Sequence, residues 1–211
     1  MSLEIDLGKS PNNNKNNEGG KMELSDLTAA MNKTKLTLVY SLCLIQFLTN
    51  SALSQLSPFY PLKARERGVS VIYIGFVLGF FAVLQIVSSA IIGRNMHKLE
   101  GGRHVLIMIG SFLLIAQIML LGLIDYVEDS DYFLFFSFLA QGLGGIGGGA
   151  NLTSSMAILS SFDGAEREQY IGWIEAANGV GLLFGPLIGA FLFSVGGYKM
   201  PFFTFGKYSI I

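Results

Sequence analysis

Five long apolar segments follow one another along the chain, separated by shorter polar stretches. Each segment is near or above the roughly 20 residues that an α-helix needs to cross a bilayer. The predicted membrane helices cover about residues 36–59, 71–92, 105–124, 132–159 and 170–195. A sixth apolar segment, MPFFTFGKYSII, occupies only the last 12 residues, 200–211. The pattern predicts an all-α polytopic membrane protein, a six-helix bundle whose sixth helix is truncated.

The N-terminal region differs from the rest of the chain. Residues 1–34 are polar and include the low-complexity string PNNNKNNEGGK. No apolar core follows a basic start, so the region does not resemble a signal peptide. We expect residues 1–34 to form a disordered tail and residues 35–211 to form the transmembrane bundle. Pro58 and Pro61 are expected to mark the end of the first helix.

Composition supports the membrane assignment and narrows the classes of partner. The chain is 51% hydrophobic and 14% charged, with a mean hydropathy of +0.52, whereas soluble domains carry about 25% charged residues. A net charge of −1 gives no reason to expect nucleic acid as a partner. Two His and one Cys exclude a disulfide framework and an all-Cys metal site within the chain. We therefore expect the lipid bilayer as a partner, and no metal, cofactor or enzymatic activity.

Charged residues between the segments predict an orientation. The segment GRNMHKLEGGRH is basic and Lys33 and Lys35 precede the first helix, whereas the link between the third and fourth helices is acidic. The positive-inside rule then places the N-terminus in the cytoplasm. Lys63, Arg65 and Arg67 oppose this assignment, because they fall on the other side.

The string GLGGIG raises an alternative, because Gly142, Gly144 and Gly147 satisfy the G-x-G-x-x-G pattern of a dinucleotide-binding turn. Such a turn should be polar and should join a strand to a helix. Here the glycines lie inside one uncharged run of about 28 residues, 132–159. We therefore predict a membrane helix whose small-residue faces admit close neighbours. The predicted pairs on these faces are Gly144 with Gly148 and Gly145 with Gly149.

The most specific stretch is GLLFGPLIGAFL in the fifth segment. Gly181, Gly185 and Gly189 recur every four residues along one helix face, and Pro186 favours a bend. Such a smooth face suits a helix that slides or rocks against a partner. Ordinary close packing accounts for any single glycine, but the full spacing with Gly-Pro is less common.

The pattern GxxxGPxxG in a fifth membrane helix resembles the antiporter signature of the major facilitator superfamily, in its proton-coupled drug and amine antiporters. A longer similarity, to the vesicular amine transporter-like branch, includes SPFYPLKARERGVSVIYIGFVLGFFAVLQIVSSAIIGR and IEAANGVGLLFGPLIGAFL. The resemblance covers about residues 36–211 and implies the first six-helix half of a twelve-helix fold. It also implies a small organic, cationic substrate exchanged for protons.

Two departures from the family pattern concern gating, with Gly93, His97, Lys98 and Arg103 as candidates, and proton coupling. The loop after the second helix usually reads G-x-x-x-D-R-x-G-R-R; this chain has Gly93, then His97 and Lys98 at the Asp-Arg positions, and Arg103 after a one-residue slip. The acid that the family uses in its gate is therefore missing. Gln141 stands where the fourth helix usually carries an arginine linked to proton coupling.

Polar residues inside the apolar segments are candidates for a substrate site. Gln46, Asn50 and Ser54 lie at i, i+4 and i+8 on one face of the first helix. The resemblance implies that the first and fourth helices line a central cavity, so this face, with Gln141 and Asn151, could bind substrate near the midplane. The alternative, that these side chains only join helices through hydrogen bonds, is equally compatible with the sequence. Gln85 and Gln117 are expected to be packing contacts.

Glu175 is the one acid well inside a predicted span, and such residues are expected to be functional. It lies one to two turns from the cytoplasmic end, where it could also reach interfacial water. We expect a gating or helix-positioning role rather than direct proton carriage.

Three functions remain open from the sequence. The first is a transporter of small organic solutes working by alternating access, present as an N-terminal half that needs its missing C-terminal half or a second chain. The second is a non-transporting, truncated membrane protein that pairs with or regulates a full-length transporter. The third is a nucleotide-dependent enzyme. The plasma membrane and intracellular vesicle or vacuole membranes are all compatible locations.

Overall fold

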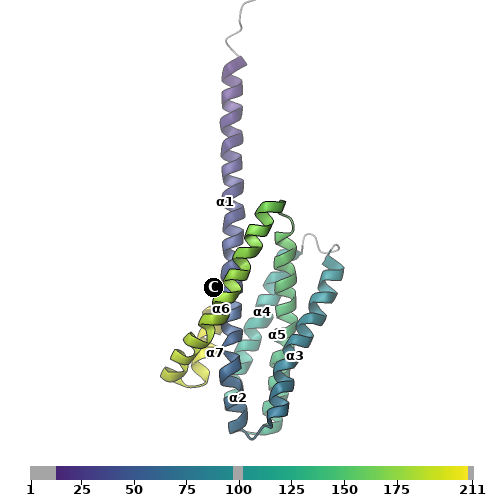
Figure 1. Cartoon of the computed structure of the whole chain (residues 1–211), viewed down its shortest axis with the longest axis vertical. Coiled ribbons are helices and arrows are strands. Elements are labelled where there is room, and N and C mark those ends of the chain that lie inside the picture. The colour runs from purple at the N-terminus through teal and green to yellow at the C-terminus, as the bar shows by residue number, and fades with distance from the viewer. Residues whose placement is uncertain (1–12, 97–101, 209–211) are drawn as a thin grey trace, which may run out of the picture. The chain divides into compact units, whose positions relative to one another are not determined.

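The computed structural model describes residues 13–96 and 102–208, and side chains within residues 29–96 and 102–205. Every regular element in these ranges is a helix, which confirms the all-α prediction (Figure 1). The elements are α1 (Asn13–Ser54), α2 (Leu56–Glu66), α3 (Val71–Asn95), α4 (Arg103–Leu123), the 3₁₀ helix η2 (Ile124–Tyr126), α5 (Ser130–Leu159), α6 (Gly164–Gly196) and α7 (Lys199–Tyr208). Five stretches are long and apolar enough to cross a membrane: Ala29–Glu66, Val71–Asn95, Arg103–Tyr126, Ser130–Leu159 and Gly164–Gly196.

The chain divides into two units, residues 1–41 and 42–211. In the first unit α1 begins at Asn13, whereas the sequence predicted a disordered tail through residue 34. The segment KMELSDLTAAMNK is rich in good helix formers. Because a helix already nucleated in the apolar segment extends at little further cost, these residues continue it toward the N-terminus.

The first predicted span is a broken helix that runs further than expected. Helix α1 ends at Ser54, and α2 begins at Leu56 and continues to Glu66. A proline ring clashes with the carbonyl group four residues earlier, which for Pro58 is that of Ser54. Pro58 itself lies in the first turn of α2, where no backbone N–H is needed. Pro58 therefore breaks the helix rather than ending it, and Pro61 lies inside α2. The prediction that the two prolines mark the exit of the helix is wrong.

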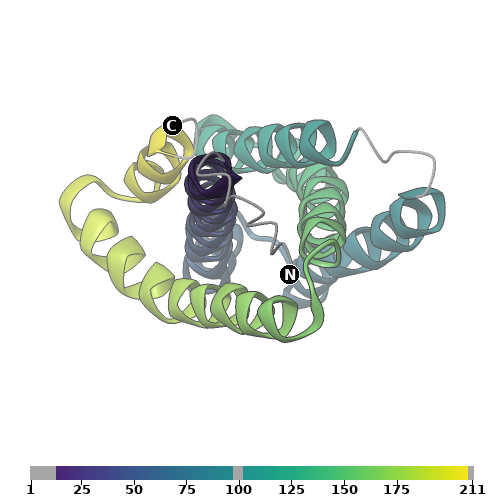
Figure 2. The same cartoon turned by 90° about the horizontal axis from the view of Figure 1, so that it is seen from above.

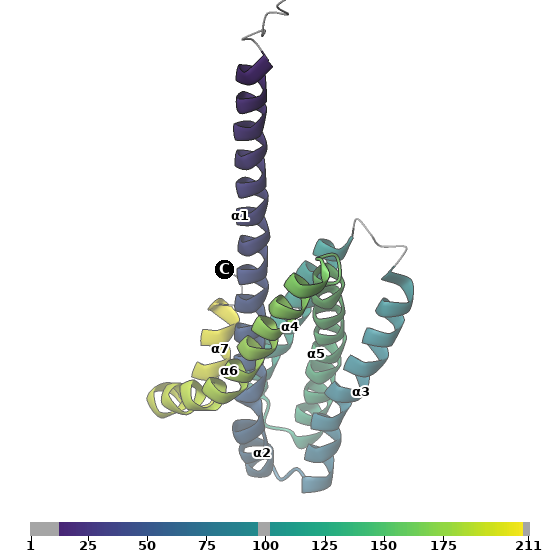
Figure 3. The same ribbon diagram turned by 45° about the horizontal axis from the view of Figure 1, so that its top comes forward.

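Helix α5 lies between α3 and α4 in the second unit (Figure 3). On the α4 side, a Cβ atom on Gly147 would lie 2.7 Å from the carbonyl oxygen of Gly110. On the α3 side, a Cβ atom on Gly145 would lie 2.6 Å from the carbonyl oxygen of Phe81. The glycines of the GLGGIG string therefore admit two neighbouring backbones, and none of them forms a nucleotide-binding turn.

One of the two predicted glycine pairs on α5 shares a helix face, and the other does not. Gly145 and Gly149 share the face toward α3, as the sequence suggested. Gly144 instead faces Gln117 on α4, whereas Gly148 faces Gln85 on α3. Gly144 and Gly148 do not share a neighbour because α5 contacts α4 on one side and α3 on the other. Two residues four apart that lie between these sides can therefore contact different helices.

Three connections between helices, α2–α3, α4–α5 and α6–α7, lie near one another at one end of the second unit. The α2–α3 and α6–α7 connections each use a glycine with positive φ, Gly68 at 77° and Gly197 at 69°. The α4–α5 connection ends at Asp129, whose side chain accepts hydrogen bonds from the backbone N–H groups of Asp131 and Tyr132 and so caps α5. Helix α7 then packs beside α4 and α6 (Figure 2).

The close approach at α5 predicts a specific sensitivity to added volume. We expect Gly147→Ala to lower the stability of the protein by about 1–3 kcal/mol, because its methyl group would press on the backbone of α4. Thermal unfolding in detergent, followed by the fluorescence of Trp173, measures the effect. Gly79→Ala is the matched control, since a Cβ atom there has nothing within 4 Å. Equal melting temperatures for the two variants would contradict the packing of α5.

Candidate functional site

A cavity of about 330 Å³ lies among the C-terminal part of α1 and helices α3, α4, α5 and α6. Its volume is within the range of about 300–1,000 Å³ typical of small-molecule sites. Its polar lining residues are Gln46, Thr49, Asn50, Gln85, Asn151, Glu175 and Asn178. Three of the five predicted substrate-site residues, Gln46, Asn50 and Asn151, therefore line one cavity together with Glu175.

The cavity presents negative charge and unpaired oxygen. Glu175 is the one ionisable side chain among the described lining residues. The Asn151 side chain is buried, and its Nδ2 atom donates to Ser111 Oγ at 3.0 Å. Its Oδ1 atom is buried without a hydrogen-bond partner in the described part of the chain. A carboxylate and a free carbonyl oxygen together suit a cationic ligand that carries hydrogen-bond donors.

An amide pair joins two walls of the cavity. Asn50 on α1 donates from Nδ2 to Oδ1 of Asn178 on α6 at 2.8 Å, and to the backbone oxygen of Gln46 at 2.9 Å. Sequence reasoning missed Asn178 and treated Gln85 as a packing residue. Asn178 could have been found, because it lies three residues after Glu175 and therefore on the same helix face.

The other two predicted substrate-site residues lie outside the cavity. Ser54 donates to the backbone oxygens of Ser51, at 3.2 Å, and Gly181, at 3.4 Å. Gln141 accepts a hydrogen bond from Gln117 Nε2 at 2.6 Å, and both side chains are buried. These two side chains join helices, which is the alternative that the sequence left open.

The glycine stripe of α6 packs against the broken helix formed by α1 and α2. A Cβ atom on Gly181 would lie 2.6 Å from the backbone oxygen of Phe47, and one on Gly189 would lie 2.8 Å from the ring of Phe59. Between them, Gly185 lies against Ser51 and Ser54. Helix α6 remains helical through Pro186. The stripe thus brings α6 close enough to α1 for the Asn50–Asn178 hydrogen bond.

Two of the predicted gating residues, Gly93 and Arg103, lie at the opposite end of the second unit from the glycine turns. Arg103 at the start of α4 donates from Nη1 to the backbone oxygen of Ala157 at 3.3 Å. That oxygen belongs to the last turn of α5, where a cation is favourable. A Cβ atom on Gly93 would lie 3.7 Å from the methyl group of Thr153. His97 and Lys98 lie outside the described residues.

Comparison with known sequences agrees with this all-helical membrane architecture. Residues 42–211 match the family model of the Major Facilitator Superfamily. The chain belongs to this superfamily.

Three relatives match this chain, each over part of the relative's own length. The chain is 30% identical over 153 residues to the human MFS-type transporter SLC18B1, covering 72% of this chain and 33% of that protein. It is 26% identical over 182 residues to Multidrug resistance protein 1 of Bacillus subtilis (strain 168), covering 86% of this chain and 44% of that protein. It is 26% identical over 184 residues to the Tetracycline resistance protein, class B, of Escherichia coli, covering 84% and 41%. The chain thus spans a third to less than half of the length of these superfamily members.

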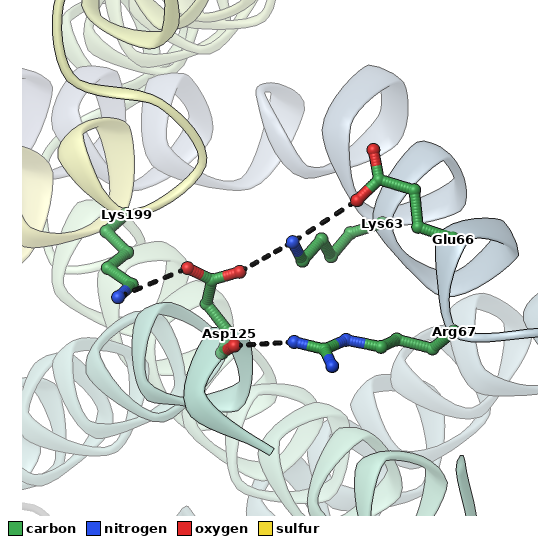
Figure 4. Close-up of polar contacts among 5 residues, drawn as sticks. All are labelled: Lys63, Glu66, Arg67, Asp125 and Lys199. Atoms are coloured by element: carbon green, nitrogen blue, oxygen red, sulfur yellow. Dashed lines mark hydrogen bonds and ion pairs between the residues drawn. The ribbon is translucent and has the colours of Figure 1, made fainter. Parts of the chain in front are cut away.

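This superfamily member also contains a charged cluster that sequence reasoning missed (Figure 4). The carboxylate of Asp125 in η2 lies 2.8 Å from Lys63 Nζ of α2 and 3.3 Å from Lys199 Nζ of α7. Arg67 donates from Nη2 to the backbone oxygen of Asp125 at 2.8 Å. Lys63 also lies 3.2 Å from Glu66. One carboxyl residue therefore joins the three connections at this end of the second unit.

Two of the three basic residues that opposed the predicted orientation belong to the cluster. Lys63 pairs with the Asp125 carboxylate, and Arg67 donates to the Asp125 backbone oxygen. The signal was present in the sequence, because in a chain of alternating spans the first and third connections lie on the same side. Basic residues in one connection and acidic residues in the other can then pair.

Asp125 is accordingly predicted to be a stability determinant. We expect Asp125→Asn to lower the free energy of unfolding by about 1.5–3 kcal/mol, because an amide cannot replace a carboxylate shared by two ammonium groups. Thermal unfolding in detergent measures the effect. Asp131→Asn is the control, since Asp131 forms no ion pair with the described residues, and a surface change of this kind alters stability by about 0.5 kcal/mol or less. The account of the cluster fails if both variants unfold at the same temperature.

Proposed function

We propose that this chain forms the N-terminal six-helix half of a membrane transporter that exchanges small organic cations for protons. The observation that carries the proposal is the polar cavity of about 330 Å³ that lies among apolar helices. Buried polar groups in membrane helices are expensive and tend to mark solute pathways. Membership of the superfamily and the names of its relatives, a transporter and two resistance proteins, support the same function.

The charge of the cavity supports a cationic solute. Glu175 supplies a carboxylate, and Asn151 supplies a buried carbonyl oxygen without a partner. An ammonium group suits each of them, because it brings a positive charge and N–H donors in one small group. A neutral solute of the same size would leave the carboxylate unpaired.

Proton exchange follows from the same carboxylate. Glu175 binds an organic cation best when it is ionised, and a proton on it removes that attraction. If one carboxylate holds either the cation or a proton, the two bind competitively. Competition at a site exposed to each side in turn is what antiport requires.

Alternating access needs a second wall for the cavity. We propose that a second six-helix bundle supplies it, either as a further part of a longer polypeptide or as a second chain. In this arrangement the N-terminus faces the cytoplasm, and the connections joined by Asp125 face the other side.

Binding of phenethylammonium to the protein in lipid nanodiscs tests the proposal. We expect radiolabelled phenethylammonium to bind and 2-phenylethanol, which is similar in size but neutral, to compete poorly. Glu175→Gln should weaken binding by about 10- to 150-fold, since a hydrogen bond to a charged group contributes about 1.5–3 kcal/mol. Lower pH should likewise weaken binding to the wild-type protein.

Glu168→Gln provides the matched control on the same helix. Glu168 is exposed and lies two turns before Glu175, outside the cavity lining. Its removal should leave phenethylammonium affinity unchanged. Equal affinities for the Glu175→Gln and Glu168→Gln variants would refute the cation site.

A further inference from the structure

A second, smaller cavity lies beside the charged cluster, and we call it the end pocket. Its volume is about 160 Å³, and it is bordered by Phe59, Lys63, Glu66, Asp125, Phe193 and Tyr198, with Leu62. It lies where α2, η2 and the α6–α7 connection meet. None of these residues lines the larger cavity.

The end pocket already holds an ammonium group, that of Lys63. Its Nζ atom lies 2.8 Å from Asp125 Oδ1 and 3.2 Å from Glu66 Oε2 (Figure 4). The same atom lies 5.9 Å from the centroid of the Tyr198 ring. Two carboxylates and an aromatic face are the groups that proteins use to recognise alkylammonium ions. Lys63 thus occupies an ammonium site as a tethered cation.

The walls of the end pocket retain unused binding capacity. Phe59 and Phe193 stack with their ring centroids 5.0 Å apart and provide an apolar surface. The Tyr198 side chain is buried, and its hydroxyl group has no hydrogen-bond partner in the described part of the chain. Burial, with smaller contributions from Tyr60 and Asp125, raises the pKa of the Tyr198 phenol, so its O–H group is retained. The phenol oxygen keeps lone pairs that can accept a hydrogen bond from an ammonium group.

The carboxylate stays in place when Lys63 leaves. Lys199 holds the second oxygen of Asp125 at 3.3 Å, and Arg67 holds its backbone oxygen at 2.8 Å. The Lys63 side chain is long and flexible, and it is 19% exposed, so it has a route to solvent. The site is therefore preorganised, while its occupant is exchangeable.

We propose that the end pocket is a second binding site, selective for a primary ammonium group, which Lys63 fills in this structure and which an incoming alkylammonium ion fills when Lys63 swings out. That this ion is the transported solute rests on the proposed function. The existence of the site does not, because its residues are separate from those around Glu175.

Chemical rescue of Lys63→Ala tests the site directly. The substitution deletes three methylene groups beyond Cβ and the ammonium group, and propylammonium supplies similar atoms. We expect Lys63→Ala to unfold at a lower temperature than the wild type in detergent. Propylammonium should restore most of the lost melting temperature in a saturable manner. It should raise the melting temperature of the wild-type protein only at higher concentrations, because there it must displace the Lys63 side chain. Tetramethylammonium, which has the charge but no N–H donors, should restore less than about a fifth of the loss.

Two double variants show in which cavity the rescuing ammonium ion binds. Rescue should disappear in Lys63→Ala/Asp125→Asn, because the shared carboxylate is absent. It should persist in Lys63→Ala/Glu175→Gln, because Glu175 lies in the other cavity. Loss of rescue in the Glu175 background would place the ammonium ion in the larger cavity and overturn the assignment. A failed Glu175 binding experiment, by contrast, would leave this result unaffected.

Absence of rescue, or equal rescue by tetramethylammonium, would also overturn the proposal. Should Lys63→Ala aggregate during purification, the same comparison is made on the yield of monodisperse protein with either ion present throughout. Recovery with propylammonium alone then supports the site, and equal recovery contradicts it.

Discussion

Close backbone contact at glycine residues is the constraint on which this arrangement of helices depends. Lipid tails are as apolar as the side chains of a membrane helix, so helices associate by packing and hydrogen bonding rather than by the hydrophobic effect. Helix α5 meets α4 at Gly147 and α3 at Gly145, and α6 meets α1 at Gly181. At each point a side chain would collide with a neighbouring backbone. These contacts set the spacing between helices and hence the width of the cavity that they enclose.

The polar residues divide into two groups according to that spacing. Where the helices touch, amides and hydroxyls pair across the contact, as in Gln117 with Gln141. Where the helices part, polar groups face the cavity, and Asn151 keeps one oxygen unpaired. Asn50 belongs to both groups, because it lines the cavity and also bonds α1 to α6 through Asn178. The same kinds of residue therefore hold the structure together and form the proposed site.

Hydropathy and spacing predicted the helices and part of the cavity from the sequence alone. Gln46 and Asn50 were found because residues four apart share a helix face. Ser54 lies on the same face of α1 four residues further on, but it packs against α6 at Gly185 instead of lining the cavity. The start of α6 at Gly164, six residues before the apolar segment, was missed because helices continue into water beyond the membrane. The Asp125 cluster was missed because it joins residues from three connections, and pairing between connections is a tertiary property.

The central claim is that α1, α3, α5 and α6 surround a water-accessible site that binds an organic cation. Cysteine labelling at two adjacent residues of α3 tests it most directly, in a Cys43→Ser background that removes the one native cysteine. Gln85 lines the cavity, whereas Ile86 is exposed on the outer surface of α3. The account predicts that Gln85→Cys reacts with a charged methanethiosulfonate reagent and that phenethylammonium protects it, while Ile86→Cys reacts slowly and is not protected. Equal reactivity at the two positions, or no protection at Gln85→Cys, would contradict it.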